Sequence, residues 1–185
     1  MAVVASSIWT LSNALTVSRL IAAPVFFCAL FGNAHVLAGL LFWGAVATDV
    51  ADGRVARARG ESSAFGGLLD HATDASFVTL GLVALSMQGA VPVALPVLVL
   101  FAFLQYMLDS KSLAGRTLRA SFLGRWNGIL YFVPLGVVAT RDAIGVAFPA
   151  DQWVLWLGQA LVLSTLVSMA DRAWTLFSAT EPSGN

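Results

Sequence analysis

The sequence predicts an all-α integral membrane protein, with six transmembrane helices around a polar cavity that faces the cytoplasm. Its 185 residues are 58% hydrophobic and only 11% charged, whereas soluble domains are roughly 45–50% apolar and about 25% charged. Several apolar runs approach or exceed the length of about 20 residues that crosses a bilayer. No segment alternates polar and apolar residues as a membrane β-barrel does. This composition excludes a soluble enzyme and a disordered chain, and the zero net charge argues against a nucleic-acid partner.

Six apolar segments form the predicted spans of one membrane domain that covers residues 1–185. Gly32 and Asn33 end the first segment, because both residues favour the backbone turn that stops a helix. Gly89 and Pro92 end the third segment, since proline cannot continue a helix. The predicted spans are 15–31, 34–59, 63–87, 93–108, 122–140 and 151–177.

The positions of the Lys and Arg residues predict the orientation. Nine of the ten lie on one side of the spans, and only Arg141 falls on the other side. The loops near Gly32 and around Gly89 carry neither residue type. Because cytoplasmic loops are enriched in Lys and Arg, we expect the basic side and both chain termini to be cytoplasmic. The expected location is the inner membrane of a cell.

Four aspartates lie at positions where membrane helices are normally apolar. Asp49 and Asp52 are three residues apart near the end of the second span, and Asp70 and Asp74 are four residues apart inside the third. Both spacings place the pair on one helix face. A carboxylate at membrane depth costs at least about 2.5–3.5 kcal/mol, so it faces the bundle interior or a water-filled cavity and takes a partner. We therefore expect two helices to present the four carboxylates to one cavity.

Divalent cations are the expected partners of these carboxylates, because four close carboxylates cannot all stay ionised without positive charge. Oxygen-only donor sets favour hard ions such as Mg²⁺, Mn²⁺ or Ca²⁺, and Mg²⁺ is commonly held together with a substrate phosphate. Gly53 and Gly66 leave room for a ligand to approach the backbone. Arg57 lies one turn after Gly53, and arginine pairs with phosphate in a bidentate manner. The pattern indicates a nucleotide or pyrophosphate ligand.

At this point the sequence shows a family resemblance. Residues 49–57 read DVADGRVAR, Gly66 follows after eight further residues, and Asp70 and Asp74 follow at intervals of four. This pattern resembles the signature of the CDP-alcohol phosphatidyltransferases, Dxx-DGxxAR-x8-GxxxDxxxD, and all eight specified positions match. The resemblance implies an enzyme that moves a phosphatidyl group from CDP-diacylglycerol to a small hydrophilic acceptor alcohol and releases CMP. Its partners would be these substrates and membrane lipid, with no nucleic acid.

The resemblance also implies a role for each matched residue. Asp49, Asp52 and Asp70 would coordinate one or two Mg²⁺ or Mn²⁺ ions on the pyrophosphate. Asp74 would be the catalytic base that takes the proton of the acceptor hydroxyl, and it would also touch the metal site. Homodimers are usual in the family, so the resemblance implies a homodimer. The residues expected to bind the CDP-lipid are Asp49, Gly53, Ala56, Arg57 and Gly66.

A second motif concerns the acceptor alcohol. Residues 13–24 read NALTVSRLIAAP, which resembles the opening of phosphatidylglycerophosphate and cardiolipin synthases, NxLTxxRxxxxP. This implies glycerol 3-phosphate as the acceptor, although His71 and Ala75 replace the Pro and Lys that are common beside the last aspartates of those synthases. A phosphorylated acceptor needs cationic ligands. The candidates are Arg19, Lys111, Arg116 and Arg125, and Arg172 is a further basic residue at the same side of the membrane.

Two other functions also use aspartates on membrane helices. A Mg²⁺-dependent prenyltransferase carries two separate Asp-rich stretches, and these usually lack the DGxxAR core. A cation carrier would use the aspartates as ion ligands, but it would not need Gly53, Arg57 and Gly66 at fixed offsets. Among the phosphatidyltransferases, glycerol 3-phosphate, an inositol phosphate, serine and other alcohols all remain open as acceptors.

Overall fold

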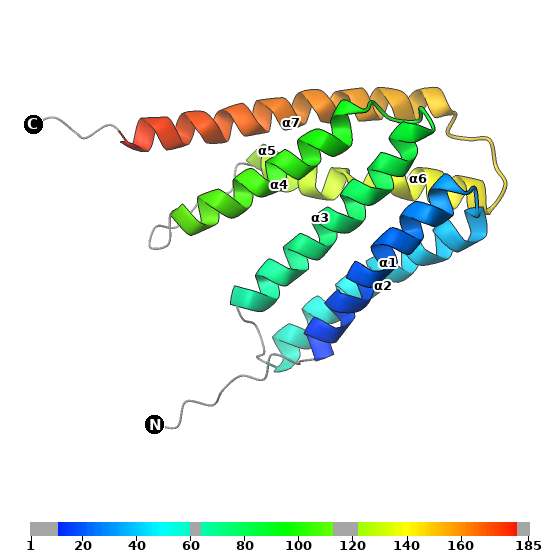
Figure 1. Cartoon of the computed structure of the whole chain (residues 1–185), viewed down its shortest axis with the longest axis horizontal. Coiled ribbons are helices and arrows are strands. Elements are labelled where there is room, and N and C mark those ends of the chain that lie inside the picture. Colours follow the sequence, from blue (N-terminus) through cyan, green and yellow to red (C-terminus); the bar gives the residue numbers. More distant parts are fainter. Residues whose placement is uncertain (1–10, 60–63, 113–121, 181–185) are drawn as a thin grey trace, which may run out of the picture.

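The computed structural model of the chain describes residues 11–59, 64–112 and 122–180, and it describes side chains within 14–51, 67–107 and 123–175. Figure 1 shows that these residues form helices joined by short connections. The described part contains no strand, so the all-helical prediction is confirmed there. The helices are α1 (Leu11–Phe31), α2 (His35–Arg59), α3 (Ala64–Met87), α4 (Ala94–Ser112), α5 (Phe122–Leu130), α6 (Phe132–Ala143) and α7 (Asp151–Thr180).

The fifth predicted span differs from the structure, where it is two helices, α5 and α6, that meet at Tyr131. Pro134 supplies the physical reason. Proline has no backbone N–H, and its ring clashes with the carbonyl four residues earlier, which here belongs to Leu130. Tyr131 keeps helical dihedral angles of −64° and −24°, so the chain continues in nearly the same direction across the interruption.

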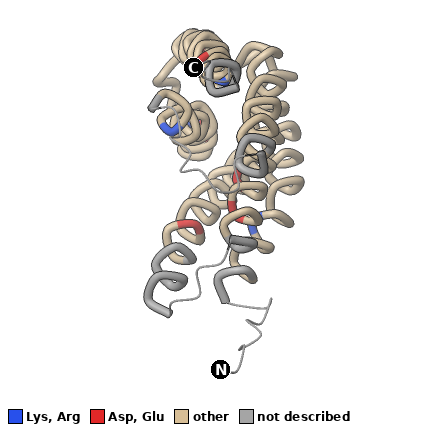
Figure 2. The backbone as a smooth tube through the Cα atoms, turned by 90° about the vertical axis from the view of Figure 1, so that its left-hand side faces the viewer, with Lys and Arg blue, Asp and Glu red and all other residues tan. Residues whose placement is uncertain are grey.

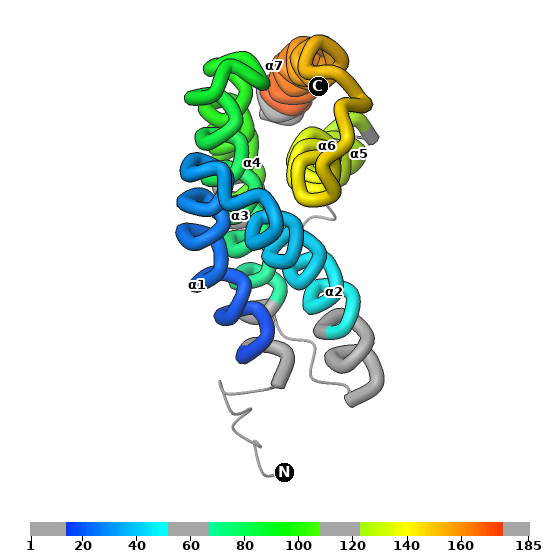
Figure 3. Tube along the Cα trace, turned by 90° about the vertical axis from the view of Figure 1, so that its right-hand side faces the viewer, coloured from blue at the N-terminus to red at the C-terminus, as the bar shows by residue number. Residues whose placement is uncertain are grey.

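The helices pack as a ring. α1 packs against both α2 and α3, α3 packs against α4, and α4 packs against α7. The ring closes through contacts of α7 with α6 and of α6 with α2, while α5 also lies on α7. Figure 3 shows α1 beside α2, with α6 next to α2 on its other side. Interior space is therefore bounded by helices that are distant in sequence.

Short turns connect the helices at one end of the ring, which we call the turn end. In Figure 1 the connections α1–α2, α3–α4 and α6–α7 all lie at this end, on the right of the picture. Asn33 adopts a left-handed φ of 56°, and Gly89 has a φ of 77°, as expected for residues that close helix turns. We call the opposite end the cavity end. Helices α2, α4 and α7 end there, and helices α1, α3 and α5 begin there.

Helices α1, α3 and α6 pack closely together. The rings of Phe26 and Phe77 stack with centroids 4.6 Å apart. A Cβ atom added at Gly81 would lie only 2.8 Å from side-chain atoms of both Leu135 and Phe26. A glycine at this position lets three helices approach closely, as small residues do in membrane bundles. This core fixes α1 against α3, the two helices that carry Arg19 and Asp70.

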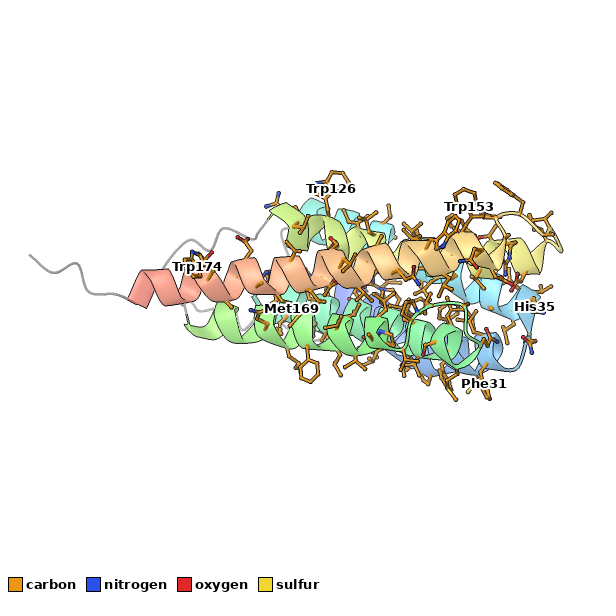
Figure 4. The ribbon with its side chains drawn as sticks, turned by 90° about the horizontal axis from the view of Figure 1, so that it is seen from above. Phe31, His35, Trp126, Trp153, Met169 and Trp174 are labelled. Atoms are coloured by element: carbon orange, nitrogen blue, oxygen red, sulfur yellow. The ribbon has the colours of Figure 1, made fainter. Side chains whose placement is uncertain are left out.

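The outer surface of the ring is apolar. Large hydrophobic residues such as Leu40, Val93 and Leu163 are exposed, and charged positions are sparse along the described tube in Figure 2. Figure 4 shows the side chains of Trp126, Trp153 and Trp174 pointing away from the helices, as expected for residues at membrane interfaces. Three helices, α1, α3 and α7, are long and apolar enough to cross a membrane, and α2 and α4 contain shorter apolar stretches. The count of six spans stays a prediction.

Candidate active site

Three of the four aspartates come together at the cavity end. Asp49 lies in α2, and Asp70 and Asp74 lie one turn apart in α3. One carboxylate oxygen of each lies within 4.8 Å of the others. Their side chains are 46%, 34% and 29% exposed, so an ion from solution can reach all three. At an effective dielectric constant of about 20, like charges this close repel by roughly 3–4 kcal/mol, and the carboxylates need a cation.

Arg19 of α1 contacts all three carboxylates. Its Nη1 donates to Asp49 at 2.5 Å and to Asp74 at 2.7 Å, and its Nη2 donates to Asp70 at 2.5 Å. The arginine is only 4% exposed. Because α1 packs against both α2 and α3, it can place one guanidinium between carboxylates from two other helices. The sequence motif had pointed Arg19 toward the acceptor phosphate, whereas the structure places it in the aspartate cluster.

The cluster borders a cavity of about 720 Å³, within the range of typical ligand sites. Asp49, Asp74 and Arg19 line one side. Apolar side chains, among them Phe103 and Phe132, line another part. A ligand with a charged head and an apolar tail therefore suits this space.

Two further arginines line the same cavity. Arg125 of α5 and Arg172 of α7 both line it. The Arg172 guanidinium carbon lies 5.3 Å from the centroid of the Tyr106 ring, in range for a cation–π interaction. The Tyr106 ring also meets the His71 ring edge-on, with centroids 5.7 Å apart. Arg125 and Arg172 thus share one cavity with the carboxylates of Asp49 and Asp74.

Gly124 makes room for Arg172. A Cβ atom at this position would lie 2.5 Å from Arg172 Nη2 and 3.1 Å from Ser168 Oγ. Any larger residue would move the guanidinium, because Cβ atoms do not approach other atoms so closely. The glycine therefore determines where the Arg172 side chain lies in the cavity.

Buried polar contacts hold α7 against α5 and the following Tyr131. Ser164 donates a hydrogen bond of 2.6 Å to the side-chain carbonyl of Asn127. The hydroxyls of Tyr131 and Thr165 lie 2.7 Å apart. Buried polar groups of this kind are stable when they are paired. These contacts fix the two helices that carry Arg125 and Arg172.

Several predicted site residues lie outside the described side chains. Asp52, Gly53, Ala56 and Arg57 fall on the last turns of α2, and Gly66 falls on the first turn of α3. Lys111 falls near the end of α4, and Arg116 lies in residues 113–121, outside the described chain. Their roles remain predictions.

Sequence reasoning missed Tyr106 and Gly124. A signal for this wall was present in α7, where Ser164, Ser168 and Arg172 recur every four residues and so share one face of an apolar helix. The partners of that face could not be identified from spacing, because Tyr106 and Gly124 lie on other helices.

The donor set fits a hard divalent ion. The cluster that the described residues form contains three carboxylates and neither histidine nor cysteine. Mg²⁺ and Mn²⁺ prefer such oxygen ligands, and Mg²⁺ commonly combines a few carboxylates with a substrate phosphate. Asp49, Asp70 and Asp74 could therefore hold a metal ion at the edge of the cavity.

Comparison with known proteins shows the family of the chain. Residues 9–164 match the family model described as CDP-alcohol phosphatidyltransferase. A probable phosphatidylglycerophosphate synthase of Mycobacterium tuberculosis is 39% identical over 173 residues, covering 87% of this chain and 78% of that protein. A fusion protein of Schizosaccharomyces pombe, a cardiolipin synthase (CMP-forming) and mitochondrial hydrolase, is 28% identical over 157 residues, covering 75% of this chain and 26% of that protein.

The family match favours phosphatidyl transfer over the prenyltransferase and the cation carrier, neither of which is expected to carry this signature. The match also fits the apolar outer surface, since the family is membrane-bound. The family uses divalent metal ions, which fits the cluster of three carboxylates. The chain belongs to the CDP-alcohol phosphatidyltransferase family, and it is an integral membrane enzyme that transfers a phosphatidyl group from a CDP-linked lipid and releases CMP.

Proposed function

We propose that the protein transfers the phosphatidyl group of CDP-diacylglycerol to glycerol 3-phosphate and so forms phosphatidylglycerophosphate. The observation that carries this acceptor is the pair of arginines, Arg125 and Arg172, which line the same cavity as Asp49 and Asp74. An acceptor that carries its own phosphate needs such cationic ligands, and arginine binds phosphate well. The name of the Mycobacterium relative, a phosphatidylglycerophosphate synthase, supports the same acceptor.

The aspartates perform the chemistry in this proposal. Asp49, Asp52 and Asp70 would hold one or two Mg²⁺ or Mn²⁺ ions, which neutralise the pyrophosphate and stabilise the departing CMP. Asp74 accepts the proton of the acceptor hydroxyl. The acceptor oxygen forms a bond to the phosphatidyl phosphorus, the bond from that phosphorus to the CMP oxygen breaks, and CMP leaves with the bonding electrons. Because the attack is on phosphorus, the protein mainly positions the groups and supplies charge.

The substrates are assigned to different parts of the cavity. Gly53, Ala56 and Gly66 would leave room for the cytidine, with Arg57 on a phosphate. The apolar lining around Phe103 and Phe132 suits the lipid part of the donor. The acceptor phosphate would lie against Arg125 and Arg172, and Lys111, Arg116 and Arg19 are the other basic candidates for it.

An acceptor assay tests the proposal. Purified protein is mixed with CDP-diacylglycerol, Mg²⁺ and one acceptor at a time, and CMP release is measured. Glycerol 3-phosphate is expected to support turnover, whereas inositol phosphate and serine are not. Turnover with one of the other acceptors alone would reject glycerol 3-phosphate while leaving phosphatidyl transfer intact.

We also propose that the cavity end faces the cytoplasm, as the distribution of Lys and Arg predicts. Single cysteines at positions 90 and 115, in a background without Cys28, test this orientation. A membrane-impermeant reagent added outside should label position 90 and not position 115. The reverse labelling would overturn it. The homodimer implied by the family resemblance also stays a prediction.

A further inference from the structure

Arg19 has an unusual place among the charged groups of the cavity. It contributes one positive charge to a cluster that contains three carboxylates, Asp49, Asp70 and Asp74, so these four groups sum to a charge of −2 when all are ionised. The two terminal nitrogens of its guanidinium reach all three carboxylates at 2.5–2.7 Å. Charge-assisted contacts of this length are the strong class of hydrogen bond.

A metal ion bound by the three carboxylates would need the same region of space. Their ligand oxygens lie within 4.8 Å of one another, and an ion that binds three of them at about 2.1 Å must lie among them. The guanidinium that is bonded to all three also lies among them. An arginine and a dication in one such space would repel each other across a short distance.

We infer that Arg19 is an internal counter-ion that competes with divalent metal for the Asp49–Asp70–Asp74 cluster and must leave the cluster when metal binds. This inference rests on the proposed metal site. Asp49 and Asp74 line the cavity and are 46% and 29% exposed, whereas Arg19 is 4% exposed, so the metal would approach these carboxylates from the cavity.

The exchange has a consequence for the acceptor. Arg19 lines the same cavity as Arg125 and Arg172, so a guanidinium displaced from the three carboxylates would lie close to a phosphate bound in that cavity. Displacement by metal would then connect the contacts of Arg19 with the aspartates to its motif-based role toward the acceptor phosphate.

Metal affinity is the direct test. Mn²⁺ binding to the purified, substrate-free protein is measured by isothermal titration calorimetry for the wild type, Arg19→Gln and Arg172→Gln. Because the apparent affinity for a ligand falls with the fraction of competent protein, we expect Arg19→Gln to bind Mn²⁺ about tenfold or more tightly than the wild type. Arg172→Gln is the matched control, since it removes the same charge from the same cavity at a residue that is not among the described partners of the three carboxylates, and its affinity should change much less.

A second measurement uses the unmodified sequence and does not depend on a variant folding. An arginine-directed dicarbonyl reagent is added to the wild type with and without Mn²⁺, and modification of Arg19 is followed by peptide mass spectrometry. Release of the guanidinium predicts faster modification of Arg19 when Mn²⁺ is bound.

The outcomes separate this inference from the proposed metal site. Mn²⁺ binding that is unchanged or weaker in Arg19→Gln, or Arg19 that is equally protected with Mn²⁺ bound, would mean that the arginine stays in place and would overturn the exchange. A wild type that binds no Mn²⁺ would instead reject the metal site itself. Asp70→Asn should lose Mn²⁺ affinity whether Arg19 leaves the cluster or stays in it. Such a loss would show that the measured ion occupies this cluster.

Discussion

The two ends of the ring each contain an arginine bonded to carboxylates, and the two arginines differ in their partners. At the cavity end, Arg19 contacts residues 30 to 55 positions away, in α2 and α3. At the turn end, Arg141 contacts the adjacent Asp142 and also Asp151, at 2.7 Å each. Arg141 also donates to the carbonyl of Pro149 at 2.8 Å. The contacts of Arg19 join helices that are distant in sequence, whereas the contacts of Arg141 close the connection between α6 and α7.

The cavities at the two ends differ even more in size. Arg19 borders the cavity of about 720 Å³, whereas the pocket at the turn end, lined by His35 and Asp142, holds about 10 Å³, or about one water molecule. Figure 4 shows His35 at the end of the ring opposite Trp174. The ion pairs at the cavity end therefore border a space large enough for a substrate, whereas those at the turn end connect neighbouring segments of the chain.

Removal of metal should produce the largest difference between the two ends. We expect a chelator to abolish CMP release, because the carboxylates at the cavity end then lack the cations that neutralise the pyrophosphate. Mg²⁺ or Mn²⁺ should restore activity. The turn end contains no proposed ligand, so helix content measured by circular dichroism should be unaffected. Full CMP release without any divalent ion would reject the mechanism.

Asp74→Asn should give the next largest effect. Asparagine keeps the size and polarity of the side chain but cannot accept the proton. We expect turnover to fall by roughly 10²–10⁴-fold, the usual contribution of a general base, while metal-dependent binding of CDP-diacylglycerol is retained. Both quantities are measured on the same preparation, by CMP release and by lipid-binding titration.

Asp49→Asn is the matched comparison for Asp74→Asn. It removes a charge from the metal site, so it should weaken binding of CDP-diacylglycerol itself. Near-normal turnover of Asp74→Asn would remove Asp74 from the base role. If both variants lose binding equally, the aspartates act as one metal cage and the base lies elsewhere.

Much of the fold could be predicted from apolar segments and turn residues. Asn33 and Gly89 marked helix ends that the structure confirms with their positive φ angles. The interruption at Tyr131 was missed because Pro134 was read only as part of an apolar span, although its effect on the preceding turn is a local one. The packing of α6 against α2 could not be predicted, because no local pattern specifies which membrane helices become neighbours.

The candidate site was predictable where its residues share a motif. The spacing of Asp70 and Asp74 put both on one face, and Asp49 joined them in the structure. The contacts of Arg19 with this cluster were not predicted, because they depend on how α1 packs between α2 and α3. Tyr106 and Gly124 were missed for the same reason: each acts through the side chain of Arg172, which comes from another helix.

Gly124→Ala should have a smaller, selective effect at the cavity end. The added methyl group would meet Arg172 Nη2 at 2.5 Å, so the guanidinium must move. If Arg172 binds the acceptor phosphate, KM for glycerol 3-phosphate should rise about tenfold, roughly 1.4 kcal/mol, with KM for CDP-diacylglycerol little changed. Gly128→Ala, one turn later in α5, is the control, because its added Cβ meets no atom within 4 Å. Equal effects of the two substitutions would argue against a specific role of Gly124.

Arg141→Gln should have the smallest effect on catalysis and a measurable effect on stability. The side chain is 12% exposed, and its loss leaves the carboxylate of Asp142 and the carbonyl of Pro149 without this donor. Hydrogen bonds to charged groups contribute about 1.5–3 kcal/mol when partly buried, and each kcal/mol shifts Tm by about 2–4 °C in a protein of this size. We therefore expect Tm in detergent to fall by several degrees, while kcat and both KM values stay close to the wild type because the turn end does not border the cavity.

Arg172→Gln should have the opposite effect, raising KM for glycerol 3-phosphate with little change in Tm. If Arg141→Gln lowered kcat as strongly as Asp74→Asn while Tm was unchanged, the distinction between a chemical end and an architectural end would be wrong.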